Sequence, residues 1–410
     1  MNATVLVLGD LGRSPRMQYH ARALADHDVD VDVVAYEGHA SRADLSGHPR
    51  IALHLVRPAA LRLRRGLPRF LYAPAAAIDA LVIGARVLGR LLGAARRPDL
   101  ILAQTPPALP TLAIAALAAR LRAARLVLDW HNFTHSLLAL RLGARHPLVR
   151  LVAWCEGALG RLAGGHLCVS RAMREELATR WRIDGAAILY DRPAEPFRAA
   201  RLPAPPDRWR WWLGGQLDVA LGPRPPALLV GPTSWTEDED SDLLLAALHR
   251  YDARDDATPL VVLMTGDGPR RREFEARVAD APMRRVQVRT RWLAPEQYPL
   301  LLAQADLGLC LHRSASGVDL PMKVADMLGA GLPVCALDYG PCLAEQVRPG
   351  ENGVLFSTAE QLAGTLADLL GGFPERTPAL DRLREGLARS PDPGWEEGWA
   401  AEARPVLLGA

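Results

Sequence analysis

The stretch LGLCLHRSASGVDLPMKVADMLGAGLPVCA, from Leu307 to Ala336, decides the fold of this chain. It predicts a buried strand, a polar loop, a helix and a second buried strand, in the order Leu307–Leu311, His312–Asp319, Met322–Leu328 and Leu332–Leu337. Glycines after the helix indicate where it ends, because glycine readily adopts the backbone conformation of a helix C-terminus. This order of elements is typical of a parallel α/β sheet.

The polar loop of this stretch has the features of an anion site. A loop that leads into a helix exposes free backbone N–H groups at the positive end of the helix dipole. Arg313 lies in the loop, and Lys323, the only lysine in the chain, follows one turn into the helix. A compact ammonium group acts as a point charge on a diphosphate. The alternative is that both side chains lie on a solvated helix face.

Length and composition narrow the class of protein. The 410 residues are enough for two domains, and 49% of them are apolar. The formal net charge of +3 indicates no general attraction to nucleic acid. Five scattered cysteines within apolar runs predict reduced thiols in a cytosolic compartment. The sequence enters a strand directly, so we expect no signal peptide, and no apolar run reaches the ~20 residues of a membrane span.

Strands and helices alternate along both halves of the chain. Predicted strands of the first half are Thr4–Leu8, Val29–Ala35, Ile51–Leu55, Leu100–Gln104, Leu126–Trp130, His166–Val169 and Ile188–Tyr190. The pattern restarts with strands at Ala227–Val230, Leu260–Thr265 and Val286–Val288. We therefore predict an α/β fold of two Rossmann-like domains facing a cleft. They are residues 1–198 and 227–375, joined by a Pro/Trp/Arg-rich linker at 199–226 and followed by a tail, 376–410, that crosses back to the first domain.

Polar residues follow two strands of the first half. In open α/β sheets, ligands bind beyond the carboxyl ends of the strands. The candidates at these ends are Asp10, Gly12, Arg13, Ser14, His131 and Asn132. A histidine suits general-base catalysis because its pKa lies near neutral pH. Alternatively, Asp10 only caps the next helix and His131 is a structural histidine. A metal site at His131 and His135 is not expected, because the metalloprotease glutamate pattern is missing.

The second half opens with TSWTEDED, Thr233–Asp240, directly after a strand. Thr236 and Glu239 have the spacing of a capping box, so this segment is expected to cap a helix. Capping alone does not explain why so many hydroxyls and carboxylates gather at a strand end.

A basic region between Arg57 and Arg97 surrounds a long apolar helix. Apolar residues recur there at helical spacing from Ile78 to Leu92, and arginines precede and follow them. Such a helix can lie on anionic lipid. Alternatively, it packs into the core and turns its arginines to solvent.

Several segments match a known family. In chain order they are LGDLGRSPRMQYHA (Leu8 to Ala21), LVLDWHNFTHSLLAL (Leu126 to Leu140), HPLVRLVAWCE (His146 to Glu156), HLCVSRAMREEL (His166 to Leu177), LYDRP (Leu189 to Pro193), TSWTEDED, SGVDLPMKVADMLGAGLPVCA (Ser316 to Ala336) and GENG (Gly350 to Gly353). Through these segments the sequence resembles glycosyltransferase family 33, the chitobiosyldiphosphodolichol β-mannosyltransferases.

The resemblance implies a GT-B fold and transfer of mannose from GDP-mannose, with inversion, to a polyprenyl or dolichyl diphosphate chitobiose, forming a β-1,4 linkage. It places the donor in the second domain. Asp326 stands where related GT-B enzymes have the second of two glutamates eight residues apart, whereas Val318 occupies the first position. The donor-binding residues expected on this basis are Thr233, Ser234, Gly266, Gly268, Ser314, Ser316, Gly317, Asp319, Lys323 and Asp326.

For the chemistry, we expect His131 or Asp10 to accept the proton of the acceptor hydroxyl, with the other residue as its orienting partner. Lys323 and the amides of residues 314–317 would stabilise the departing diphosphate. No metal or other cofactor is expected. Eukaryotic members of the family usually carry an N-terminal hydrophobic anchor, so here membrane contact is expected to fall to the Arg57–Arg97 region.

The expected location is cytoplasmic, peripheral to the cytosolic face of a membrane. Three alternative functions remain open. The first is another GT-B transferase that acts on a different glycolipid or an exopolysaccharide precursor. The second is a sugar-nucleotide 2-epimerase, and the third is a catalytically silent subunit.

Overall fold

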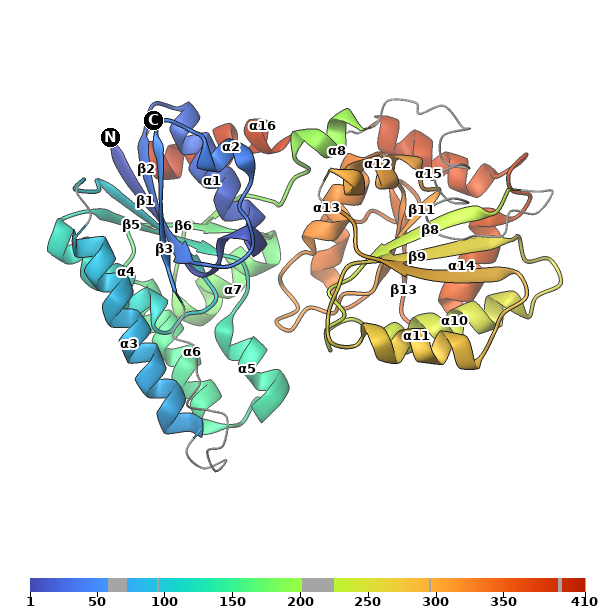
Figure 1. Cartoon of the computed structure of the whole chain (residues 1–410), viewed down its shortest axis with the longest axis horizontal. Coiled ribbons are helices and arrows are strands. Elements are labelled where there is room, and N and C mark those ends of the chain that lie inside the picture. Colours follow the sequence, from blue (N-terminus) through green and yellow to red (C-terminus); the bar gives the residue numbers. More distant parts are fainter. Residues whose placement is uncertain (58–71, 94–95, 201–224, 295, 390–392, 410) are drawn as a thin grey trace. The chain divides into compact units, whose positions relative to one another are not determined.

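The computed structural model describes the whole chain except residues 58–71, 94–95, 201–224, 295, 390–392 and 410. It divides into two compact units. The first comprises Met1–Tyr190 together with Glu396–Ala410, and the second comprises Asp191–Trp395 (Figure 1). Each unit is a parallel sheet covered by helices, so the predicted pair of Rossmann-like domains is confirmed.

The first unit is built on a seven-stranded sheet in the order β3-β2-β1-β4-β5-β6-β7. Its strands are β1 (Asn2–Asp10), β2 (Asp30–Tyr36), β3 (Ile51–Val56), β4 (Leu100–Thr105), β5 (Arg125–Trp130), β6 (Gly165–Cys168) and β7 (Ala187–Ile188). All pairings are parallel. The inner strands are apolar on both faces because helices cover both. Polar residues therefore gather where these strands end.

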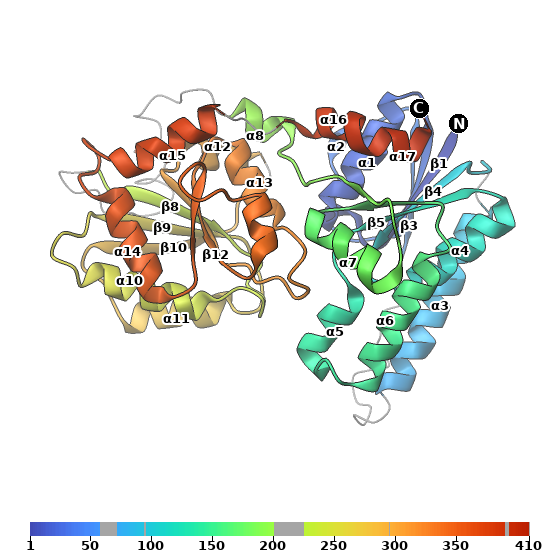
Figure 2. The same ribbon diagram turned by 180° about the vertical axis from the view of Figure 1, so that it is seen from behind.

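The helices of the first unit alternate with its strands along the chain. They are η1 (Leu11–Arg13), α1 (Pro15–Asp26), α2 (Ala43–Ser46), α3 (Tyr72–Gly93), α4 (Thr111–Arg122), α5 (Thr134–Leu142), α6 (Pro147–Gly160) and α7 (Arg171–Trp181). Within this unit, α3, α5 and α6 extend past the end of the sheet at which β5 runs into α5 (Figures 1 and 2). That end is the carboxyl end of the strands.

The second unit has a six-stranded parallel sheet in the order β10-β9-β8-β11-β12-β13. The strands are β8 (Ala227–Pro232), β9 (Leu260–Thr265), β10 (Val286–Arg291), β11 (Leu307–Cys310), β12 (Val334–Leu337) and β13 (Gly353–Phe356). One apolar layer joins the sheet to α10 (Ser241–Asp252), α11 (Arg271–Asp280) and α14 (Ala359–Leu370). A second layer joins it to α12 (Gln297–Gln304) and α13 (Met322–Gly329). The strand–loop–helix–strand prediction for Leu307–Ala336 is confirmed as β11, loop, α13 and β12.

The boundary between the units lies earlier than the predicted residue 198. The segment that begins at Asp191 leads into α8 (Glu195–Ala199), which packs on the second unit. The ring of Phe197 contacts that of Tyr298, with centroids 5.6 Å apart. Pro193 packs closely against Gly329. A Cβ atom added at Gly329 would lie 2.1 Å from the Cβ atom of Pro193. Most of the predicted linker, residues 201–224, lies outside the described part of the chain.

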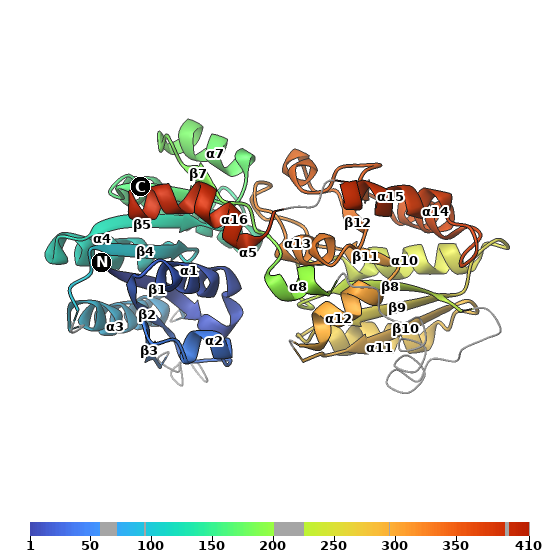
Figure 3. The same cartoon turned by 90° about the horizontal axis from the view of Figure 1, so that it is seen from above.

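The end of the chain returns to the first unit, as predicted for the tail. The predicted tail first contributes α15 (Pro378–Arg389) to the second unit, and then η5 (Trp399–Ala403) and α17 (Arg404–Leu408) pack beside β7 and β6 (Figure 3). Trp399 is buried, and its indole N–H donates to Nδ1 of His20 at 3.0 Å. The C-terminal segment is therefore a structural part of the first unit.

Replacing Trp399 by alanine should destabilise the first unit by about 3–5 kcal/mol, because it leaves a cavity and removes the hydrogen bond to His20. The measurement is denaturant unfolding of the full chain. Trp292→Ala is the matched control, since Trp292 is 61% exposed. Equal shifts in the two variants would contradict a packing role for the C-terminal segment.

Candidate active site

Lys323 does not project freely from α13. Its ammonium group forms an ion pair with the carboxylate of Glu239, whose side chain is 4% exposed. The other oxygen of Glu239 accepts the backbone N–H groups of Ser234 and Trp235, at 2.8 and 2.9 Å, and the hydroxyl of Thr233. One carboxylate thus ties the loop after β8 to the first turn of α13.

The predicted capping box of Thr236 and Glu239 is wrong. Asp240 caps α10, and its side chain accepts the N–H of Leu243 at 2.9 Å. Glu239 instead turns inward, because a buried carboxylate is stabilised by a cationic partner and several N–H donors. The density of polar residues in TSWTEDED thus reflects this buried network as well as helix capping.

Gly266 and Gly268 are required by the close approach of the β8 and β9 loops. A Cβ atom at Gly266 would lie 1.9 Å from the carbonyl oxygen of Thr233, and Gly266 has φ +126°. A Cβ atom at Gly268 would lie 2.0 Å from the carbonyl oxygen of Ser234. Four predicted donor-site residues are therefore brought together at the carboxyl ends of two neighbouring strands.

The serine loop between β11 and α13 is held together by Asp319, which is 8% exposed. One of its carboxylate oxygens accepts the hydroxyls of Ser314 and of Ser316, the latter at 3.0 Å. The N–H of Gly317 donates to Ser314 Oγ at 2.8 Å, and Gly317 has φ +74° with open space on its Cβ side. These residues fix the loop through hydrogen bonds to one another. Because no atom lies within 4 Å of the position of a Cβ at Gly317, the loop backbone is open there.

Arg313 and His312 connect the serine loop to the loop before α10. Arg313 Nη2 pairs with Asp240 at 2.9 Å, so this guanidinium already has an anionic partner. His312 lies between Asp238 and Asp319, with nitrogen–oxygen distances of 3.1 and 3.4 Å. Burial alone would lower the pKa of His312, but hydrogen bonds to the two carboxylates raise it to about 9. His312 is thus a cation that joins two acidic loops.

This raised pKa makes the second unit sensitive to alkaline pH. Because the folded pKa exceeds the unfolded value of 6.5, the stabilisation is complete below pH 6.5 and is lost as pH rises through about 9. The difference in unfolding free energy between wild type and His312→Gln should therefore shrink by about 3 kcal/mol over that range. Chemical denaturation of both proteins across this pH range measures it. A difference independent of pH would contradict a charged His312.

Asp326 lies in α13, one turn after Lys323. Burial raises the pKa of its carboxyl well above the usual range, and the nearby carboxylate of Asp191 adds to the shift. Asp191 belongs to the LYDRP segment, so two motifs from separate parts of the sequence meet at this position.

In the first unit, Asp129 is the centre of a buried network. Arg16 forms a two-pronged ion pair with it, at 2.8 and 2.9 Å, and His20 and His131 reach one of its oxygens at 3.1 and 2.8 Å. Burial alone would raise the pKa of Asp129, but the Arg16 and His131 side chains hold it well below its usual range. Asp129 is therefore a buried anion at the end of β5.

The hydrogen bonds of this network fix which ring nitrogens carry protons. The Trp399 indole can only donate, so Nδ1 of His20 accepts and Nε2–H points at Asp129. Burial lowers the pKa of His20, in agreement with a neutral ring. His131 also turns Nε2 to Asp129, and Nδ1 of His131 has no hydrogen-bond partner among the described residues. That nitrogen is free to accept a proton.

Asp10 lies at the end of β1 and pairs with His39, not with His131. Its carboxylate accepts the backbone N–H of Gly12 at 3.0 Å, the backbone N–H of His39 at 3.0 Å and His39 Nδ1 at 2.5 Å. Burial alone would raise the pKa of Asp10, but the hydrogen bonds from His39 lower it. The expected base-and-orienter pair of Asp10 and His131 is therefore not formed, and each has a different partner.

The predicted acceptor residues occupy the same strand ends. Ser14 donates its hydroxyl to the carbonyl of Asp10 at 3.1 Å, and Asn132 accepts the N–H of Phe133 at 2.7 Å. Gly12 leaves no room for a side chain, because a Cβ atom would lie 2.7 Å from the carbonyl of His39. Arg13 is exposed.

Sequence reasoning missed Arg16, His20 and His39 and gave Asp129 no role. Arg16 and His20 are four residues apart on α1, a spacing that places both on one helix face. Together with the Asp129 carboxylate at the end of β5, this spacing could have predicted the buried network. His39 lies in an irregular loop, so no local pattern singles it out.

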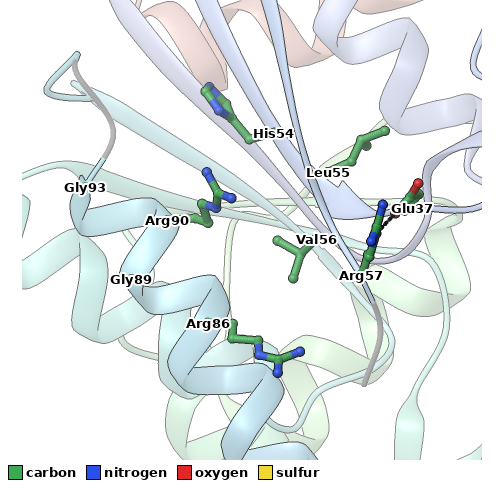
Figure 4. A pocket seen from close by; sticks show the side chains of 9 residues that line it. All are labelled: Glu37, His54, Leu55, Val56, Arg57, Arg86, Gly89, Arg90 and Gly93. Atoms are coloured by element: carbon green, nitrogen blue, oxygen red, sulfur yellow. Dashed lines mark hydrogen bonds and ion pairs between the residues drawn. The ribbon is translucent and has the colours of Figure 1, made fainter. Parts of the chain in front are cut away.

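A basic cavity of about 960 Å³ lies at the edge strand β3, away from the inner strand ends. It is lined by Glu37, His54, Leu55, Val56, Arg57, Arg86, Gly89, Arg90 and Gly93. Figure 4 shows Arg86 and Arg90 of α3 on one side and the β3 residues on the other. Arg57 pairs with Glu37 at 2.9 Å, whereas no described carboxylate pairs with Arg86 or Arg90. The Arg57–Arg97 region thus offers unpaired cations, although residues 58–71 lie outside the description.

Several known proteins similar to this chain are glycosyltransferases. Residues 12–194 match the family described as glycosyl transferase 4-like domain, and residues 224–371 match glycosyl transferases group 1. Chitobiosyldiphosphodolichol beta-mannosyltransferase of Mus musculus is 39% identical over 98% of this chain and 88% of that protein, and the Homo sapiens protein of the same name is 38% identical over 99% and 92%. The chain belongs to the chitobiosyldiphosphodolichol beta-mannosyltransferase family. UDP-glycosyltransferase TURAN of Arabidopsis thaliana is 39% identical over 99% of the chain and 97% of its own length.

Solved structures support the GT-B fold of this family member. Anabaena Alr3699/HepE in complex with UDP superimposes with a TM-score of 0.65 at 16% identity, and the match covers 95% of each chain. WaaG, a glycosyltransferase involved in lipopolysaccharide biosynthesis, gives 0.67 at 15% identity and covers all of both chains. Among the described helices, none combines the length and apolar character that a membrane span requires.

Proposed function

We propose that this family member transfers mannose from GDP-mannose to a lipid diphosphate chitobiose, with inversion, forming a β-1,4 linkage. The observation that carries the proposal is the near full-length similarity to proteins named chitobiosyldiphosphodolichol beta-mannosyltransferase. The retained polar networks at the strand ends of both units support an enzyme rather than a silent subunit.

The donor diphosphate is proposed to bind at the serine loop and the start of α13. Lys323 supplies a cation whose charge is balanced by Glu239, so the site is ordered before the donor arrives. Gly317 leaves its outer side open to an approaching phosphate. As the bond to mannose breaks, charge grows on the diphosphate, and the Lys323 ammonium and the loop amides stabilise it.

His131 is proposed as the general base. Asp129 holds Nε2–H, which leaves Nδ1 free to take the proton of the acceptor hydroxyl. Asp10 is less suited, because His39 and Gly12 already donate to its carboxylate. After proton transfer, the His131 ring lies beside the Asp129 carboxylate, 2.8 Å from Nε2.

We further propose that the protein works peripherally on the cytosolic face of a membrane and needs no metal. The lipid in the relatives' name is the support for the membrane. Transfer assayed with and without a chelator tests the metal requirement.

A transfer assay tests the function. Purified protein is incubated with a short-chain chitobiosyl diphosphate lipid and either GDP-mannose or a UDP-hexose, since one similar protein is named a UDP-glycosyltransferase. We expect a β-mannosylated trisaccharide lipid from GDP-mannose only. Product from the UDP-sugar alone would reassign the donor. Conversion of the donor without an acceptor would indicate an epimerase or a hydrolase instead.

A further inference from the structure

The α5–α6 hairpin exposes an unusual number of large apolar side chains. Their exposed fractions are 39% for Leu137, 65% for Leu140, 41% for Leu142, 44% for Leu148, 52% for Leu151 and 67% for Trp154. They lie within 18 residues of sequence, on two helices that pack against each other. Six large exposed apolar side chains on one pair of packed helices exceed the scattered exposure that is ordinary for a folded unit, which points to a binding surface.

The charge of the hairpin has a single sign. From residue 134 to residue 155 there is no aspartate or glutamate, whereas Arg141, Arg145 and Arg150 are all exposed. No described carboxylate pairs with any of these three arginines. The one acidic residue of α6, Glu156, is fully buried. Basic residues beside exposed leucine and tryptophan match an anionic lipid surface, where tryptophan prefers the headgroup level.

The two helices of the hairpin are held to each other by a buried carboxylate. Glu156 on α6 accepts the N–H of Thr134 at 2.6 Å and Nδ1 of His135 at 2.6 Å, so it holds the start of α5. Both helices extend past the carboxyl end of the sheet (Figures 1 and 2). His131 lies three residues before α5. A bilayer that touches the hairpin would thus lie on the side of the sheet where the candidate base is found.

We propose that the α5–α6 hairpin is the surface on which this protein rests on a bilayer containing anionic lipids. Leu140, Leu151 and Trp154 enter the boundary between headgroups and acyl chains, and the three arginines contact lipid phosphates. The inference rests on the proposed function, since it is a lipid-linked acceptor that requires the enzyme to work at a membrane. It assigns this role to the hairpin and not to the basic cavity beside α3.

Binding of the full chain to vesicles tests the proposal. The vesicles contain phosphatidylcholine with phosphatidylserine, or phosphatidylcholine alone, and bound protein is measured by co-sedimentation at several salt concentrations. Each arginine near an anionic surface is worth about a five-fold change in partition, so R141S/R145S/R150S should bind roughly 100-fold more weakly to the anionic vesicles. L140S/L151S/W154S should lose binding to both kinds of vesicle, because apolar insertion does not depend on lipid charge.

Matched controls use exposed residues elsewhere on the same unit. L117S/L121S replaces leucines of α4 that are 45% and 59% exposed, and R86S/R90S removes the unpaired arginines of the basic cavity. Both should bind vesicles as the wild type does. All replaced residues except Arg86 and Arg90 lie outside any described cavity, and thermal unfolding of each variant confirms that the fold is retained.

Three results would overturn the proposal. They are unchanged vesicle binding by both hairpin variants, loss of binding in R86S/R90S instead, or a dimeric wild type that becomes monomeric in the hairpin variants. The last would make the hairpin an interface between copies.

Transfer to a short-chain, water-soluble acceptor without vesicles should be equal in wild type and hairpin variants. A wild type that binds vesicles but shows no transfer in that assay would contradict the proposed function and leave the membrane surface standing.

Discussion

Lys323→Ala is expected to lower kcat/KM for mannose transfer by about 10²–10³, because the variant loses a cation aimed at the departing diphosphate. The structure adds a second consequence that the sequence did not predict. Removing the ammonium leaves the Glu239 carboxylate, 4% exposed, without its cationic partner. Loss of one partner from a buried pair costs about 3–5 kcal/mol, and less here because Lys323 is 26% exposed.

The two consequences can be separated with a second substitution. Glu239→Gln removes the uncompensated charge while an amide oxygen can still accept the N–H groups of Ser234 and Trp235. The double variant Lys323→Ala/Glu239→Gln should recover stability in denaturant unfolding but not activity. If activity returned with stability, Lys323 would be a structural residue, and the assignment of the diphosphate site to this loop would be contradicted.

The sheets could be predicted from the sequence because their strands are short, apolar and bounded by turn residues. β4, β9 and the β11–α13–β12 unit match their predictions within about two residues. The start of α5 is not evident from the sequence, because Phe133 occupies the N-cap position and has no capping side chain. The start of α5 is instead held by Glu156, 22 residues away from Thr134. Only the tertiary fold shows such a contact.

The candidate residues lie at strand ends, as the sequence predicted, but their hydrogen-bond partners differ from the predicted ones. Thr236 and Glu239 have capping-box spacing, yet the Glu239 carboxylate pairs with Lys323, which lies 84 residues further along the chain. Asp10 and His131 are both at strand ends, yet each finds a closer partner in His39 and Asp129. Spacing along the chain predicts which elements carry polar groups, whereas partner choice depends on which loops the sheet order brings together.

His131→Gln is expected to lower kcat by about 10²–10⁴ with little change in KM, because the glutamine amide can still donate to Asp129 but cannot accept a proton. Asp129→Asn is a poorer test of the same idea. It would leave the buried Arg16 without its anion, and the resulting loss of stability would hide any effect on chemistry. The conservative histidine variant avoids this problem, since His131 is partly exposed and its replacement keeps the charge balance around Asp129.

His39→Gln is the matched control, because it alters the other histidine–carboxylate pair of the same unit. The backbone N–H of His39 and that of Gly12 still hold Asp10 in this variant, so the loop should stay in place. Single-turnover rates of both variants, at saturating donor and acceptor, would report the chemical step. A loss in His39→Gln that equals or exceeds the loss in His131→Gln would move the general base to the Asp10–His39 pair, where the Nε2 atom of a largely exposed ring would take the proton.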